Sequence, residues 1–124
     1  MIDKKIIKIT IIFAVFSYVV SFSEQIDQEE LALHHFMQGQ FLMNQGNYAL
    51  AILEFQDAII IDPNISTIHL SIADAYRRLG KIKRSEEHLR ISIELDPNEV
   101  ETLEMLGQLL ISKKEFNEAR VIFT

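Results

Sequence analysis

An Asp-Pro-Asn tripeptide occurs twice in this chain, and its two prolines, Pro63 and Pro97, lie 34 residues apart. A proline has no N–H to donate within an α-helix and fixes its own φ angle, so each tripeptide is expected to end one helix. The asparagine after each proline, Asn64 or Asn98, can cap the following helix with its side-chain oxygen. The spacing therefore predicts helical units of 34 residues that are joined at these tripeptides.

The chain has 124 residues, enough for one folded domain, with a formal net charge of −6 and no cysteine. Without cysteine it has no disulfide, no thiolate metal site and no cysteine nucleophile. Residues 24–124 hold 17 acidic and 9 basic residues, which gives this part a net charge of −8. A body this acidic argues against general binding to nucleic acid or to anionic membranes.

The N-terminal segment has the parts of a secretory signal peptide. Three lysines within the first eight residues precede an apolar run of 14 residues from Ile9 to Phe22, and Ser21-Phe22-Ser23 supplies a small-x-small ending. The run is shorter than the ~20 residues of a spanning helix, although counting from Ile6 lengthens it to 17. We predict a signal peptide at residues 1–23, with an uncleaved membrane anchor or a buried helix as alternatives. Cleavage or anchoring would place the remainder in the periplasm or cell envelope of a bacterium.

Helical hydrophobic spacing covers the rest of the chain, with no strand pattern. Asp27-Gln28-Glu29-Glu30 has the spacing of a capping box, so the first helix is expected to begin there. Glycines at positions 46 and 80 and the two tripeptides separate the helices, and Asn47 and Asn98 are expected N-caps. The expected helices span residues 28–45, 48–61, 66–79, 82–95 and 98–112, with a sixth from Glu115.

Helix pairs in tandem, none of which can bury its apolar face alone, form a stacked solenoid. Small residues are placed where two helices would approach closely, and bulky residues would fill the gaps between helices. With the two prolines, these residues resemble the pattern of tetratricopeptide repeats (TPRs), in register from about residue 30 to residue 124. The small ones are Gly39, Ala51, Ala58, Ala73, Ser85, Gly107 and Ala119, and the bulky ones are Phe55, Tyr76, Leu89 and Phe123.

The resemblance implies an all-α solenoid of helix-turn-helix units that form a right-handed superhelix. The TPR domain would span residues 32–124 after a short lead-in at residues 24–31. It would contain about two and a half repeats, at residues 32–65, 66–99 and 100–124, the last of them incomplete.

The chain ends before a third tripeptide would complete its last repeat. A solenoid normally carries a polar face or an extra helix at its ends. We therefore expect a fragment or truncated product, or an open end that is covered by a partner, which includes self-association through the last helices. The residues expected to lack a covering element are Leu106, Leu109, Leu110, Val121, Ile122 and Phe123.

Histidines replace the large aromatic residue that the family usually has near the start of a repeat. His35 and His69 hold this position in the first two repeats, Leu103 holds it in the third, and Gln38 replaces an expected leucine and would face water. Position-equivalent residues on stacked helices lie roughly 8–10 Å apart. We interpret these residues and the other histidines, His34 and His88, as packing residues, and we expect no metal or cofactor.

In TPR proteins a ligand peptide usually lies along the concave face made by the first helix of each pair. Carried over by position, this face would be apolar at Leu33 and Phe36, basic in the middle and acidic at its far end. An acidic residue beside apolar anchors would complement it; alternatively, Leu33 and Phe36 pack under the N-terminal segment and the arginines are solvated. The candidate groove residues are Leu33, Phe36, Gln40, Met43, Asn44, Thr67, Leu70, Asp74, Arg77, Arg78, Glu101, Glu104 and Gln108, with Ile111 and Ser112 at the margin.

One TPR subtype grips the C-terminal carboxylate of cytosolic chaperones with lysine, arginine and asparagine side chains. The matching positions here are Phe36, Gln40, Ser71, Glu104 and Gln108. None of these residues is a cation, so the carboxylate clamp is not expected.

The basic cluster between Arg77 and Arg84 has acidic neighbours, Glu86 and Glu87, and no interleaved aromatic residues. A solvated turn is therefore preferred to a phosphate or nucleic-acid site. No nucleophile–base pair, phosphate-binding glycine loop or paired-carboxylate site is present in the sequence.

The prediction is an exported, non-catalytic scaffold or adaptor that binds a peptide or helix of a partner protein in its concave groove. The membrane would be contacted only through residues 1–23, if these are retained. The alternative is an N-terminal TPR module of a longer protein whose activity lies beyond Thr124.

Overall fold

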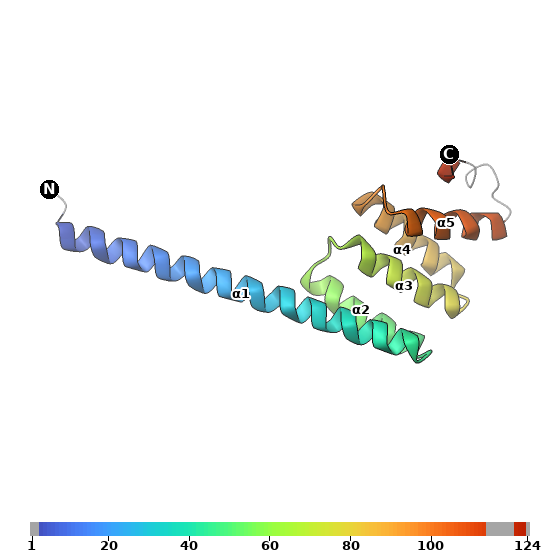
Figure 1. Ribbon diagram of the computed structural model, residues 1–124, viewed down its shortest axis with the longest axis horizontal. Coiled ribbons are helices and arrows are strands. Elements are labelled where there is room, and N and C mark those ends of the chain that lie inside the picture. The colour runs from blue at the N-terminus through green and yellow to red at the C-terminus, as the bar shows by residue number, and fades with distance from the viewer. Residues whose placement is uncertain (1–2, 114–120, 124) are drawn as a thin grey trace.

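The computed structural model describes residues 3–113 and 121–123 and consists, in these ranges, of helices and turns without strands. The long helix α1 (Lys4–Asn44) runs far beyond the body of the molecule, and four shorter helices follow (Figure 1). They are α2 (Tyr48–Ile61), α3 (Ser66–Arg78), α4 (Ile82–Leu95) and α5 (Val100–Ser112). The all-α solenoid predicted from the sequence is confirmed.

Each helix packs on the next one in the chain. The C-terminal part of α1 pairs with α2, α3 pairs with α4, and the two hairpins stack through α2 and α3, with α5 packed on α4. Two clusters form the core, one around Phe55 and Ile72 in the first hairpin and one around Leu89 and Leu110 in the second. Because α1 also contacts α3, the first helices of successive pairs line one side of the stack.

The turns inside the hairpins need glycine. Gly46 and Gly80 have φ angles of 77° and 72°, which side chains with a Cβ rarely adopt. After each glycine, the next N–H returns to a carbonyl five residues earlier: Asn47 to Leu42 at 2.9 Å and Lys81 to Tyr76 at 2.9 Å. These bonds satisfy carbonyl groups left free at the helix ends, so the expected helix ends at the two glycines are confirmed.

The joints between hairpins depend on their aspartates rather than on their asparagines. Asp62 Oδ1 accepts the N–H of Asn64 at 3.1 Å, and Asp96 Oδ1 accepts the N–H of Asn98 at 3.0 Å. The N-cap residues are Ile65 for α3 and Glu99 for α5. The expected caps by Asn64 and Asn98 are therefore wrong, because each asparagine belongs to the turn that its aspartate closes.

Two further expectations about helix ends do not hold. Asn47 occupies the N-cap position of α2 but makes no capping hydrogen bond with its side chain. The expected start at Asp27 is also wrong, because α1 is continuous from Lys4 and its N-cap is Asp3. Between these positions the sequence has no proline or glycine to break a helix.

The C-terminal leucines are covered, contrary to expectation. Leu106, Leu109 and Leu110 are at most 4% exposed and pack in the core cluster that contains Leu70 and Leu89. The apolar face of α5 is therefore buried against the preceding hairpin. The expected start of the sixth helix at Glu115 lies outside the described residues. Val121 and Phe123 are exposed as expected, whereas Ile122 is partly buried against the same core cluster.

Close approach of paired helices requires a glycine at position 39. A Cβ added to Gly39 would overlap the ring of Phe55 on α2, and one added to Gly107 would overlap the ring of Phe123. In the second repeat the equivalent residues, Ala73 and Leu89, lie together in one core cluster. Where glycine is replaced by the larger alanine, phenylalanine is replaced by the smaller leucine.

We expect Gly39→Ala to lower the free energy of unfolding by about 1–3 kcal/mol, because the added methyl group overpacks against the Phe55 ring. The double variant Gly39→Ala/Phe55→Leu copies the second repeat, so its loss should fall short of the sum of the two single losses by about 0.5–3 kcal/mol. Urea unfolding followed by circular dichroism measures these values.

The exposed neighbour Gln38→Ala is the matched control and should change stability by less than about 0.5 kcal/mol. Strictly additive losses in the double variant would show that Gly39 and Phe55 do not determine the approach of the two helices.

Candidate functional site

Side chains of α1, α3 and α5 line a shared groove along the stack. Its middle hollow encloses about 340 Å³, and two neighbouring hollows share residues with it. Thr67 connects it to the hollow beside the first joint, and Gln40 connects it to the hollow at the end of α1. We refer to these three hollows together as the groove. The residues of its middle hollow are Gln40, Met43, Thr67, Leu70, Ser71, Asp74, Arg77, Arg78, Glu101 and Met105.

The structure brings most of the candidate groove residues together. Leu33 and Phe36 line the hollow beside the joint, and Asn44 lines the hollow at the end of α1. Glu104 and Gln108 are exposed on α5 and belong to none of the three hollows. The face expected from helical spacing therefore exists, although its predicted acidic end is reduced to Glu101. Binding of a partner there remains a prediction.

A polar contact crosses the middle of the groove. Gln40 Nε2 on α1 donates to Ser71 Oγ on α3 at 2.9 Å. Ser71 is buried, and the neighbouring Leu70 is only 5% exposed. This contact links α1 and α3 across the groove wall.

The predicted basic middle of the groove is partly neutralised by Asp74. Asp74 accepts hydrogen bonds from Arg77 Nη2 at 2.5 Å and from Arg78 Nε at 3.0 Å. The hydrogen bond to Asp74 is the main cause that raises the pKa of Arg78, whose guanidinium also lies 5.6 Å from the centre of the Tyr48 ring. The three charged side chains together carry one positive charge, so the predicted basic middle keeps half of the charge of its two arginines.

The rest of the basic cluster faces solvent. Lys81, Lys83 and Arg84 are exposed in the turn after α3 and the start of α4, and Arg84 Nη1 lies 3.5 Å from Glu87 Oε2. This arrangement agrees with the solvated turn expected from the sequence.

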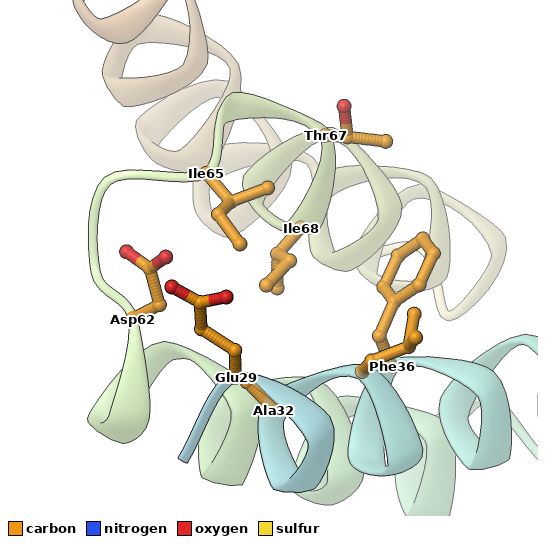
Figure 2. Close-up of a pocket in the computed structure, with 8 residues that line it drawn as sticks. Glu29, Ala32, Phe36, Asp62, Ile65, Thr67 and Ile68 are labelled. Carbon is orange, nitrogen blue, oxygen red and sulfur yellow. The ribbon is translucent and has the colours of Figure 1, made fainter. Parts of the chain in front are cut away.

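The hollow beside the first joint, which we call the joint pocket, includes residues that the sequence reasoning missed. They are Glu29 and Ala32 on α1, Asp62 and Ile65 in the joint, and Ile68 on α3 (Figure 2). Glu29 lies four residues before Leu33 and therefore on the same helix face, but it is not among the groove residues expected from the sequence. Asp62 had been interpreted only as a turn residue.

In each hairpin one polar pair of side chains links the two helices. The two pairs occupy equivalent positions in the two repeats. In the first hairpin, His35 Nδ1 lies 2.8 Å from Glu54 Oε2. In the second, His69 Nδ1 lies 3.1 Å from His88 Nδ1, so one ring donates its N–H to the other. His35 and His69 thus contact the second helix of their own hairpin, as packing residues do. His34 is exposed, contrary to the expectation that it packs.

One group of side chains has the chemistry of a metal site. Ligand atoms of His35, Glu54 and Asp57 lie within 4.8 Å of one another. An imidazole and two carboxylates suit a divalent transition metal. His35 and Glu54 already bond each other, which explains their arrangement without an ion.

Burial affects both rings of the second pair. Desolvation lowers the pKa of His69, and desolvation followed by the charge of His69 lowers the pKa of His88 to about 4. Both rings are therefore neutral in the folded protein at neutral pH, and the hydrogen bond between them is compatible with this state, because a neutral imidazole has one donor and one acceptor nitrogen.

Comparison with known proteins supports the repeat pattern. A family model described as tetratricopeptide repeat matches residues 35–65 and 66–99. A search of curated proteins found no significant relative.

Solved structures of TPR proteins resemble the fold. The second TPR of Spaghetti (RPAP3) bound to the HSP90 peptide SRMEEVD has a TM-score of 0.75 and 22% identity, covering 82% of this chain and 93% of that one. The second TPR domain of human RPAP3 in complex with the HSP70 peptide SGPTIEEVD has a TM-score of 0.71 and 22% identity, covering 77% and 80%. MamA (41-end) from Desulfovibrio magneticus RS-1 has a TM-score of 0.69 and 20% identity, covering 73% and 51%.

Because His69 and His88 are neutral in the folded protein, we expect the free energy of unfolding to depend on pH. The pKa values of both rings are lower in the folded state than the ordinary value of 6.5, so the unfolded chain binds more protons as the pH falls below that value. The free energy of unfolding should therefore decrease between about pH 6.5 and pH 4 and change little through His88 below pH 4.

His88→Leu should reduce this decrease, because it removes the ring with the larger shift and leaves the other three histidines in place. Urea unfolding between pH 4 and pH 7 measures it. An unchanged pH dependence in the variant would contradict the assignment to this pair.

Proposed function

Because this chain belongs to the tetratricopeptide repeat family, we propose that it is a non-catalytic adaptor of the bacterial cell envelope that binds a segment of a partner protein in its groove. The observation that carries this proposal is the groove itself. Three hollows that share residues give an extended, open surface between α1, α3 and α5. An extended surface accommodates a length of chain, whereas a single enclosed cavity accommodates a small molecule.

The similar structures support a peptide or protein as the ligand class. Two of them, both from RPAP3, hold chaperone peptides that end in EEVD. In this chain, Phe36, Gln40 and Ser71 stand where the carboxylate clamp is expected to have cations or asparagine, so we propose an internal segment of the partner rather than a chaperone C-terminus. Its apolar side chains would contact Leu33, Phe36 and Met43.

An acidic residue of the partner would bind beside Arg77 and Arg78. Asp74 occupies Nε and Nη2 of Arg77 and Nε of Arg78. Each guanidinium has five N–H donors, so both arginines retain donors for a second carboxylate. The attraction is moderate, because Asp74 cancels one of the two positive charges.

We further propose export, with residues 1–23 as a signal peptide or, alternatively, as a retained anchor. The N-terminal part of α1 is long and apolar enough to cross a membrane, and none of this apolar window is buried in the molecule. A signal sequence and an anchor share these features, and three lysines at its start favour the cytoplasmic side for the N-terminus.

The proposed location predicts that a protease added outside spheroplasts digests residues 24–124. An intact mass that lacks residues 1–23 identifies a cleaved signal peptide, and a full-length chain that stays in the membrane pellet after alkaline carbonate identifies an anchor. Full-length chain that is protected in spheroplasts and found in the cytoplasmic fraction would contradict export.

The proposed binding mode predicts that Thr67→Trp lowers the recovery of a partner from envelope extracts at least about tenfold, because the indole fills the junction of two hollows. Thr67 is exposed, so the indole does not enter the core; the substitution removes only the exposed hydrogen bond from Thr67 to Glu99. Gln56→Trp, at an exposed position on α2, is the matched control and should recover as much partner as the original protein. Equal recovery by both variants would contradict binding in the groove.

A further inference from the structure

The joint pocket has apolar walls that are open to solvent. Its floor is formed by Ala32 and Ile68, which are 4% and 2% exposed, and its margin by Leu33 and Ile65, which are 56% and 38% exposed. It encloses about 480 Å³, within the ~300–1,000 Å³ typical of ligand pockets. A partner therefore finds a preformed place for apolar side chains at this end of the groove.

Two carboxylates stand at one side of this apolar pocket. Figure 2 shows Glu29 from α1 and Asp62 from the joint at the same end, opposite Phe36. Asp62 Oδ1 accepts the N–H of Asn64, which leaves its second oxygen for another donor. Within the described ranges neither carboxylate forms a salt bridge, whereas Asp74 in the middle of the groove pairs with two arginines.

We propose that the joint pocket binds an apolar side chain of the partner that is followed or preceded by a lysine or arginine. This inference rests on the proposed function and specifies the chemistry of the bound segment. The apolar side chain would lie against Ile65 and Ile68, and the adjoining cation would lie between Glu29 and Asp62. Glu29 is exposed and Asp62 is half-buried, and a cation paired with carboxylates forms charge-assisted hydrogen bonds that are stronger than neutral ones.

Charge complementarity selects this occupant over others. The two carboxylates repel an acidic peptide or an anionic lipid headgroup, and residues 24–124 carry a net charge of −8. A purely apolar segment would leave both carboxylates unpaired beside it. In a segment with an apolar residue next to a cation, the apolar residue would contact the walls of the pocket and the cation would pair with the two carboxylates.

The same charges give the bound segment a direction. The carboxylates lie at the joint pocket, whereas Arg77 and Arg78 line the middle hollow. A segment with its cation near Asp62 and its anion near Arg77 fits the groove in one orientation and meets like charges in the reverse one.

Selection from a random dodecapeptide phage library tests the proposal, with the full chain held in phosphatidylcholine nanodiscs. We expect the selected peptides to contain leucine, isoleucine, methionine or phenylalanine next to lysine or arginine. The most enriched peptide is then synthesised with a fluorescent label, and its affinity is measured by anisotropy.

The decisive variant is Glu29→Gln/Asp62→Asn, which removes both charges and keeps the side-chain oxygen that Asn64 requires. It should bind the peptide about threefold to tenfold more weakly, and the difference should shrink as salt is added. The control Glu24→Gln/Asp27→Asn removes the same number of charges from positions on α1 outside the joint pocket, and should retain the affinity of the original protein.

The outcomes separate this inference from the function on which it rests. Peptides that bind, are blocked by Thr67→Trp and are unaffected by Glu29→Gln/Asp62→Asn would overturn the inference and leave groove binding intact. Selection of acidic peptides would overturn it as well. If the selected peptides bind equally well to Thr67→Trp, the groove itself is excluded as their site, and both proposals fail.

Discussion

The architecture depends on how closely the two helices of each hairpin approach each other. In the first hairpin Gly39 leaves space that the Phe55 ring fills completely, and the residues 34 positions later, Ala73 and Leu89, make a smaller version of the same contact. Protein interiors are packed as densely as organic crystals, so these contacts set the spacing of the helices within a pair. Pairs of equal geometry then stack with α1, α3 and α5 on one side, and the groove is a consequence of that repetition.

Polar contacts supplement packing between the second and third repeats. Ser92 and Thr102 are fully buried, and their hydroxyl groups share a hydrogen-bonded cluster with the carboxylate of Glu99, which also accepts from Thr67 at 3.3 Å. Buried hydroxyl groups are costly unless they are bonded. Here each of the two hydroxyl groups is hydrogen-bonded, so the cluster links α3, α4 and α5 beside the groove. It lies at the joint that the second Asp-Pro-Asn turn forms.

The helices that repeat could be predicted from the sequence. Features that depend on one particular side-chain contact could not. Helices α2 and α4 begin and end at the predicted residues, because glycine and proline punctuate them. The salt bridges of Asp74 were not predictable with confidence, since helical spacing places many charges near one another without showing which will pair. Glu29 was missed because the capping-box spacing of Asp27 and Glu30 predicted a helix that begins there. In the structure α1 is continuous from Lys4, and Glu29 lies within it beside the joint pocket. Leu106 and its neighbours were expected to be uncovered because the sequence does not show which side of a helix its partner occupies.

The central claim is that a partner segment lies in the groove between the first helices of successive repeats. Hydrogen–deuterium exchange of the chain, alone and saturated with a partner protein purified from the envelope, measures this most directly. Binding in the groove should slow exchange in α3 around Thr67 and Leu70 and in α1 between Phe36 and Met43. Slower exchange confined to α2 and α4, with α1 and α3 unchanged, would contradict it.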